Sequence, residues 1–205
     1  MKQFRNRPGQ CLVLALILTF ALIGTAGATE NSKIVRSDAS ESQLALINEL
    51  WGKDITVLEY MKIVHPEHLA GVPEPVLKTL ADQKMNWWEI KPEPGGSTPT
   101  DKASVSVSVI GYKLDYRTIR LGGTCTAFGL ANPPSYIYVE AFLINSGTGQ
   151  TVDSTAASAQ NQWSVTALKD KLNPASGNYY VHAWGYIPSP NYAEGSADTN
   201  VFGFP

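Results

Sequence analysis

The residues of this chain that could bind a metal are two histidines and a glutamate within four positions, in the run His65-Pro66-Glu67-His68. Imidazole nitrogens and carboxylate oxygens are ligands that zinc takes in proteins. Zinc-binding histidine pairs on helices usually sit four residues apart and need a third ligand from elsewhere. The remaining histidine, His182, lies in the other half of the chain. We therefore interpret the run as a turn at a helix end, and we expect no metal site and no cofactor.

A cysteine and a histidine form the second candidate for chemistry, with Cys125 as the nucleophile and His182 as its base. Cys125 shares one side of an alternating pattern with Ile119 and Leu121, so we expect a buried, unreactive thiol. The sequence contains no His-Glu-x-x-His and no Gly-x-Ser-x-Gly motif, and the acidic residues after position 90 form no evident pair. We therefore expect a protein that is not an enzyme. The alternative is a hydrolase or inhibitor whose site is built from residues far apart in the sequence.

Asp153 offers hard oxygen ligands of the kind that calcium prefers, close to the loop that begins at Asn145. The spacing of oxygen-bearing residues around it matches no calcium-binding loop. A solvated hairpin is therefore the expected structure here.

Aromatic residues alternate with aliphatic ones in two strand-like segments, 136–145 and 178–187. Successive side chains of a strand point to opposite faces. If Ile137, Val139 and Val181 face a core, the alternate positions make one broad aromatic face. Its members are Tyr136, Tyr138, Phe142, Tyr180, His182, Trp184 and Tyr186. This face is our candidate binding surface, because it is more apolar than a solvated sheet should be.

Three hypotheses account for this aromatic face. In the first, helices encoded ahead of the strands fold over it, and the rings form a second core layer. In the second, the face or a free sheet edge binds another protein or another copy of the chain. In the third, the rings stack on a polysaccharide while Glu140 and Asn178 bond its hydroxyls.

Two capping boxes predict short helices between residues 40 and 90. Ser40 with Gln43, and Thr56 with Glu59, have the spacing at which side chains satisfy the free amides of a helix start. A third helix is expected over residues 75–83. Three helices of this length are too few to be stable alone, so they should dock on something.

The hydrophobic period changes from that of a helix to that of a strand after a segment rich in proline and glycine, residues 91–102. Seven short strands then follow, separated by turn sequences, and they predict an antiparallel β-sandwich. With its even strand spacing and its Pro174-Ala-Ser-Gly-Asn-Tyr-Tyr180 lead into a late strand, this half resembles the immunoglobulin-like accessory domains of secreted prokaryotic surface proteins. The resemblance brings no catalytic or binding residues with it, and the paired cysteines of antibody domains are absent.

The first residues of the chain predict its destination. Basic residues precede an apolar run of about 13 residues, and Ala26-x-Ala28 follows, which is typical of a secretory signal peptide cleaved after Ala28. Cleavage would leave 13 basic and 18 acidic residues. A chain this acidic is not expected to bind nucleic acid. No other stretch is apolar enough to span a bilayer, so we expect no membrane insertion after signal cleavage.

The expected organisation is therefore a mainly β protein with a C-terminal immunoglobulin-like sandwich of about seven strands, preceded by about three short α-helices. Its segments are a signal peptide (1–28), a flexible tail (29–39), a helical segment (40–90), a linker (91–102) and the sandwich (103–205). We expect a secreted, non-catalytic protein of the cell surface, periplasm or extracellular space. Its sandwich would mediate protein binding or self-association, with polysaccharide binding as the alternative.

Overall fold

The protein is described by a computed structural model that covers residues 33–88, 103–188 and 192–205, all within one compact unit, Lys33–Pro205. The expected signal peptide and linker lie outside the described residues. Among the described residues, no helix combines the length and the apolar composition that a membrane crossing requires.

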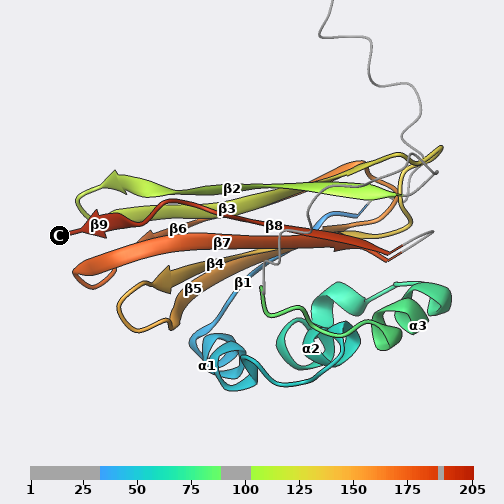
Figure 1. Cartoon of the computed structure of the whole chain (residues 1–205), viewed down its shortest axis with the longest axis horizontal. Coiled ribbons are helices and arrows are strands. Elements are labelled where there is room, and N and C mark those ends of the chain that lie inside the picture. Colours follow the sequence, from blue (N-terminus) through green and yellow to red (C-terminus); the bar gives the residue numbers. More distant parts are fainter. Residues whose placement is uncertain (1–32, 89–102, 189–191) are drawn as a thin grey trace, which may run out of the picture. The chain divides into compact units, whose positions relative to one another are not determined.

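Two antiparallel sheets pack face to face, and a layer of helices lies against one of them (Figure 1). The strands are β1 (Val35–Asp38), β2 (Ser104–Asp115), β3 (Thr118–Phe128), β4 (Ile137–Asn145), β5 (Thr151–Ala159), β6 (Ser164–Leu172), β7 (Gly177–Ile187), β8 (Ala193–Asp198) and β9 (Phe202–Phe204). The smaller sheet has the order β2-β3-β6, and the larger has the order β1-β5-β4-β7-β8, with β9 also paired to β7. This division of consecutive hairpins between two sheets confirms the expected immunoglobulin-like sandwich.

The helices begin where the capping boxes predict. They are α1 (Glu41–Leu50), α2 (Val57–Val64) and α3 (Glu74–Asp82), with a 3-10 turn, η1 (Pro66–Leu69), between the last two. Ser40 accepts a hydrogen bond from the Gln43 amide, and the Gln43 side chain accepts one from the Ser40 amide. Thr56 and Glu59 make the same reciprocal pair at the start of α2. Each box satisfies two amides that a helix start leaves unpaired.

Two strands, β1 and β8, were not predicted from the sequence. Residues 35–38 were expected in a flexible tail, but they form β1, which pairs with β5 from Val35↔Ser158 to Asp38↔Thr155. This segment is polar, so its alternation of half-buried and exposed residues is weak in sequence. β8 was missed for a similar reason, because Ala193–Asp198 contains glycine, serine and two acidic residues.

The two faces of β4 belong to two different cores, which agrees with the first of the three hypotheses for the aromatic face. Ile137, Val139, Ala141 and Leu143 lie between the sheets with residues of β3 and β7. Tyr136, Tyr138, Phe142 and Ile144 lie with the helices. A strand buried on both faces reads as a nearly continuous apolar run, which is why β4 carries so few polar residues.

The sandwich core is packed tightly enough that one glycine is required at its centre. A Cβ atom added to Gly185 would lie 2.7 Å from Cys125 Cβ and 2.9 Å from the Tyr138 carbonyl oxygen. We expect Gly185→Ala to lower the free energy of unfolding by about 1–3 kcal/mol, because the β7 backbone must move away from β3. Urea denaturation measures the change.

The matched control is Gly203→Ala, since the nearest atom to a Cβ at Gly203 is 3.5 Å away. The control should unfold like the wild type. Equal stability of both variants would show that the sheets are not in close contact at Gly185.

Candidate functional site

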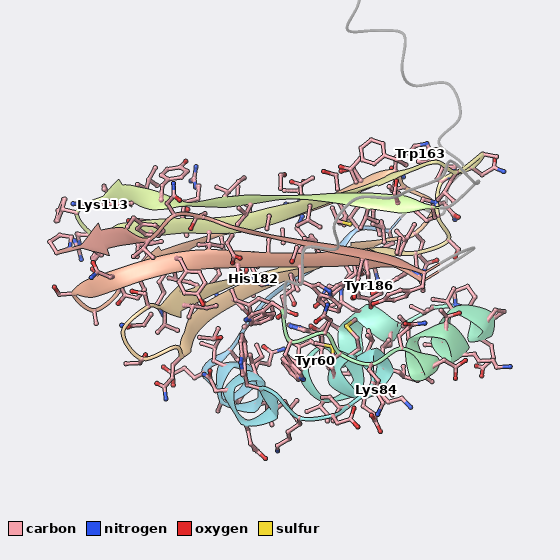
Figure 2. The ribbon with its side chains drawn as sticks, in the orientation of Figure 1. Tyr60, Lys84, Lys113, Trp163, His182 and Tyr186 are labelled. Atoms are coloured by element: carbon pink, nitrogen blue, oxygen red, sulfur yellow. The ribbon has the colours of Figure 1, made fainter. Side chains whose placement is uncertain are left out.

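The aromatic face identified in the sequence is covered by the helical layer. Six of its seven residues have exposed fractions of 3% or less: Tyr136, Tyr138, Phe142, His182, Trp184 and Tyr186. Tyr180 is partly buried against the same cluster. Figure 2 shows His182, Tyr186 and Tyr60 in the layer between the larger sheet and the helices. The structure therefore agrees with the hypothesis that the helices cover these rings, and it offers no open aromatic face there for a ligand.

Tryptophans at the ends of the helical segment cover one side of this face. The Trp88 ring centroid lies 4.3 Å from that of His182 and 4.8 Å from that of Phe142. Trp51 packs edge-on against Trp88 at 3.8 Å. Aromatic pairs in such tilted arrangements contribute about 0.5–1.5 kcal/mol beyond the burial of their area. The rings thus form a core layer rather than a recognition surface.

A fully buried carboxylate, that of Glu140 on β4, lies at the centre of this layer. Its Oε2 accepts hydrogen bonds from the hydroxyls of Tyr60 at 2.9 Å and Tyr138 at 2.8 Å. Its Oε1 lies 3.0 Å from His65 Nε2 and 3.4 Å from Ser154 Oγ. Burying a carboxylate costs several kcal/mol unless hydrogen bonds replace its water, and these four donors do so. Tyr60 and His65 come from the helical layer, so the network joins that layer to the sheet.

The network continues outward from His65 to a second cluster near the surface. His65 Nδ1 lies 3.1 Å from Ser37 Oγ and 3.2 Å from Glu67 Oε1. His68 Nε2 lies 3.2 Å from Ser37 Oγ, and His68 Nδ1 lies 2.7 Å from Ser158 Oγ. Both imidazoles are fully covered, whereas the Glu67 side chain is 37% exposed. The run His65-Pro66-Glu67-His68 is the turn at the end of α2 that was expected, and its two imidazoles belong to a buried polar cluster.

The environments of these groups shift their pKa values in opposite directions. Burial would lower the pKa of His65, but the adjacent Glu140 carboxylate, with Glu67, raises it overall. Burial and the neighbouring His65 lower the pKa of His68 to about 4. Burial beside Glu140 raises the pKa of Tyr60 well above its ordinary value. His68 is therefore a neutral base at physiological pH and Tyr60 a neutral hydrogen-bond donor.

The structure keeps Cys125 and His182 apart. Cys125 lies between the sheets against Gly185, and burial raises the pKa of its thiol to about 12. His182 points to the other face of β7, where its Nδ1 lies 2.7 Å from Asp198 Oδ1. A protonated thiol without a base is not a nucleophile, so this pair does not form a catalytic site.

Asp153 is also engaged internally. Its Oδ1 accepts a hydrogen bond from Lys169 Nζ at 2.8 Å, and Lys171 Nζ lies 3.6 Å from its Oδ2. Two ammonium groups on one buried carboxylate take the place of a cation. Asp153 is therefore a buried residue of β5 rather than part of the solvated hairpin that was expected.

The outer face of the smaller sheet is open and carries an apolar patch. Cross-strand rows place Ile110, Gly122 and Leu168 side by side, and Tyr112, Arg120 and Asp170 in the next row. Leu168 lies over Gly122, where an added Cβ would meet Leu168 Cδ1 at 2.9 Å. Tyr112, Leu168 and Leu172 have exposed fractions of 45, 44 and 64%. We call Ile110, Tyr112, Leu168 and Leu172, with the Arg120–Asp170 pair, the outer-sheet patch.

A groove between α2 and α3 is a second open apolar surface. The groove is lined by side chains of α2, η1 and α3: Leu58, Lys62, Leu69, Glu74, Pro75, Leu77, Lys78 and Ala81. Its polar groups are two lysines and one glutamate, which do not make an acid–base or nucleophile pair. We assign no chemistry to it.

Sequence reasoning missed three of the groups that make these sites. Ser37 lay in an expected tail, Glu140 was considered only for sugar binding, and the outer-sheet patch was not identified. The alternation in β2 and β6 was a usable signal for the patch, because Tyr112 and Leu172 occupy positions that should be solvated. Nothing in the sequence indicates that Glu140 and His65, 75 residues apart, meet.

Comparisons with known proteins do not place the chain in a family. The chain matches no protein family description, and no curated protein matches it. Among solved structures, it is similar over 47% of its length to a β-glucuronidase of glycoside hydrolase family 2, with 11% identity and a TM-score of 0.32. It is similar over 47% to a putative β-galactosidase from Bacteroides fragilis, with 13% identity and a TM-score of 0.33. The chain spans 12% and 17% of these proteins, and a likeness of this extent carries no inference about activity.

The network around Glu140 predicts the effect of removing one donor. Tyr60→Phe deletes a single hydroxyl and leaves Glu140 with one hydrogen bond fewer in a buried site. We expect the free energy of unfolding to fall by about 1–3 kcal/mol, measured by urea denaturation.

The control is Tyr116→Phe, because Tyr116 is 73% exposed in the turn between β2 and β3. It should change stability by less than about 0.5 kcal/mol. If Tyr60→Phe were as stable as this control, the hydroxyl of Tyr60 would not contribute to the network.

Proposed function

We propose that the protein is an exported, non-catalytic binding module that assembles with a second copy of itself through the outer-sheet patch. Export is supported by the signal-like first 28 residues. The observation that carries the assembly proposal is the asymmetry of the sandwich. One sheet is covered by helices, whereas the other leaves large apolar side chains in solvent.

The patch has the composition of a protein contact. Leucine and tyrosine side chains lie around a central arginine, and buried tyrosine and arginine residues carry much of the energy of protein interfaces. Leu168 and Leu172 are aliphatic, which leaves Tyr112 as the one ring of the patch on which a sugar could stack. Leu168 fills the space over Gly122, which keeps the middle of the face shallow and suits a flat partner.

The charge on the patch is internally balanced. Arg120 Nε and an Nη of the same guanidinium contact the two oxygens of Asp170 at 2.7 and 2.8 Å. Hydrogen bonding to Arg120 lowers the pKa of Asp170, so the pair stays ionised at neutral pH. Two identical patches can therefore face each other about a twofold axis without like-charge repulsion. A second copy of the chain is for this reason the partner that fits.

The alternatives receive less support. The aromatic face on which polysaccharide binding depended lies under the helices. The nucleophile and base considered in the sequence lie on opposite faces of β7. Neither observation favours a sugar ligand or a hydrolytic reaction.

Light scattering coupled to size exclusion, over a range of protein concentrations, tests the proposal. The wild type should move from the mass of one chain towards that of two. Leu168→Glu should raise the dissociation constant at least tenfold, about 1.4 kcal/mol, since each carboxylate would meet its symmetry mate in an apolar contact.

The matched control is Ile63→Glu, because Ile63 on α2 is 43% exposed, almost the same as Leu168. It should associate like the wild type. A wild type that is monomeric at every concentration, or a Leu168→Glu variant that associates normally, would contradict self-association through this patch.

A further inference from the structure

Acceptor atoms from His65, Glu67 and His68 converge at the outer end of the buried network. One ligand atom from each residue lies within 4.8 Å of the others. Glu67 Oε1 is 3.2 Å from His65 Nδ1 and 3.9 Å from His68 Nε2. Ligands at about 2.0–2.1 Å from a tetrahedral zinc ion are about 3.3 Å from one another, a separation that the 3.2 Å pair matches and the 3.9 Å pair exceeds.

Each nitrogen of His65 faces a carboxylate oxygen, Nε2 that of Glu140 and Nδ1 that of Glu67, so Nδ1 can bind a metal only when the ring is neutral and its proton is on Nε2. The Glu140 oxygen that faces His65 accepts hydrogen bonds only, so His65 Nε2 must carry the proton at this 3.0 Å contact. In a neutral imidazole the other nitrogen then has a free lone pair. A carboxylate behind a ligand histidine is the usual outer partner of a zinc site, because it orients the ring and increases its basicity.

His68 is oriented in a corresponding way by Ser158. Its Nδ1 lies 2.7 Å from Ser158 Oγ, while its Nε2 points to the cluster. When His68 donates from Nδ1, its Nε2 is also a free acceptor. The hydroxyl of Ser37 lies 3.1 and 3.2 Å from the two acceptor nitrogens, but its single proton can serve only one of them.

Three potential ligand atoms thus lie close together beside the hydroxyl of Ser37. We propose that His65 Nδ1, His68 Nε2 and Glu67 Oε1 bind one zinc ion, with Ser37 Oγ beside the fourth position. Two imidazoles and a carboxylate suit zinc better than calcium or magnesium, which take mainly oxygen ligands. This site is independent of the proposed self-association.

The position of the site gives the metal a structural role. The ligands lie on η1 and the residue before it, whereas Ser37, Glu140 and Ser158 come from β1, β4 and β5. A bound ion would hold the ligand histidines in place, and through their hydrogen bonds it would stabilise the contact of the helical layer with these three strands. Glu67 is the ligand through which the ion would enter, because it is part-exposed and the imidazoles are covered.

Calorimetric titration of the chelator-treated, full chain with zinc chloride tests the proposal. The wild type should bind one zinc ion per chain, and its melting temperature should rise with zinc. Cobalt in place of zinc should give the visible absorption of a four-coordinate ion. Glu67→Gln keeps the size of the side chain and should weaken zinc binding on the order of tenfold or more.

Two control variants separate this site from non-specific binding. Glu74→Gln removes an exposed carboxylate of α3, and His182→Gln removes the histidine outside the cluster; both should bind zinc like the wild type. Circular dichroism verifies that each variant is folded. A folded wild type without one-to-one zinc binding, or a folded Glu67→Gln variant with unchanged affinity, would overturn the proposal.

Discussion

The buried carboxylate of Glu140 is the constraint on which the arrangement of the helical layer depends. A carboxylate removed from water must find donors, and Glu140 finds two on its own sheet and two on the helical segment. Without Tyr60 and His65, Glu140 would keep only the two donors of its own sheet, and burying its carboxylate would cost more free energy. The helices are therefore part of the fold of the sandwich rather than an attached domain.

Side-chain hydrogen bonds also hold α1 against the larger sheet and against α2. The Asn48 side chain of α1 donates a hydrogen bond to the Thr151 carbonyl and accepts one from the Thr151 amide. It thus satisfies the two backbone groups that a neighbouring strand would otherwise pair. The Gln43 side chain donates to the Val64 carbonyl and joins α1 to the end of α2. Helices of 8 to 10 residues are marginal alone, so these tertiary contacts and the aromatic layer supply their stability. Because the aromatic face is used in this way, it is not an open surface for a ligand.

Local signals in the sequence were sufficient for much of this structure. The two capping boxes located the starts of α1 and α2, and the alternation in 136–145 separated the aliphatic side chains of the core between the sheets from the aromatic side chains of the opposite face. Cys125 was correctly expected to be buried. Strands β1 and β8 could not be found, since their polar residues carry no alternation and only the partner strand specifies them. The clusters around Glu140 and His68 could not be found either, because their members come from segments separated by 75 to 90 positions.

We expect the helical layer and the sandwich to unfold together, as one cooperative unit. Native-state hydrogen exchange of backbone amides in α2 and in β4, followed over increasing urea, measures this most directly. We expect the best-protected amides of both elements to exchange through the same global opening, with the same free energy and the same urea dependence. Exchange of the α2 amides at a clearly lower free energy, while β4 stays protected, would contradict it.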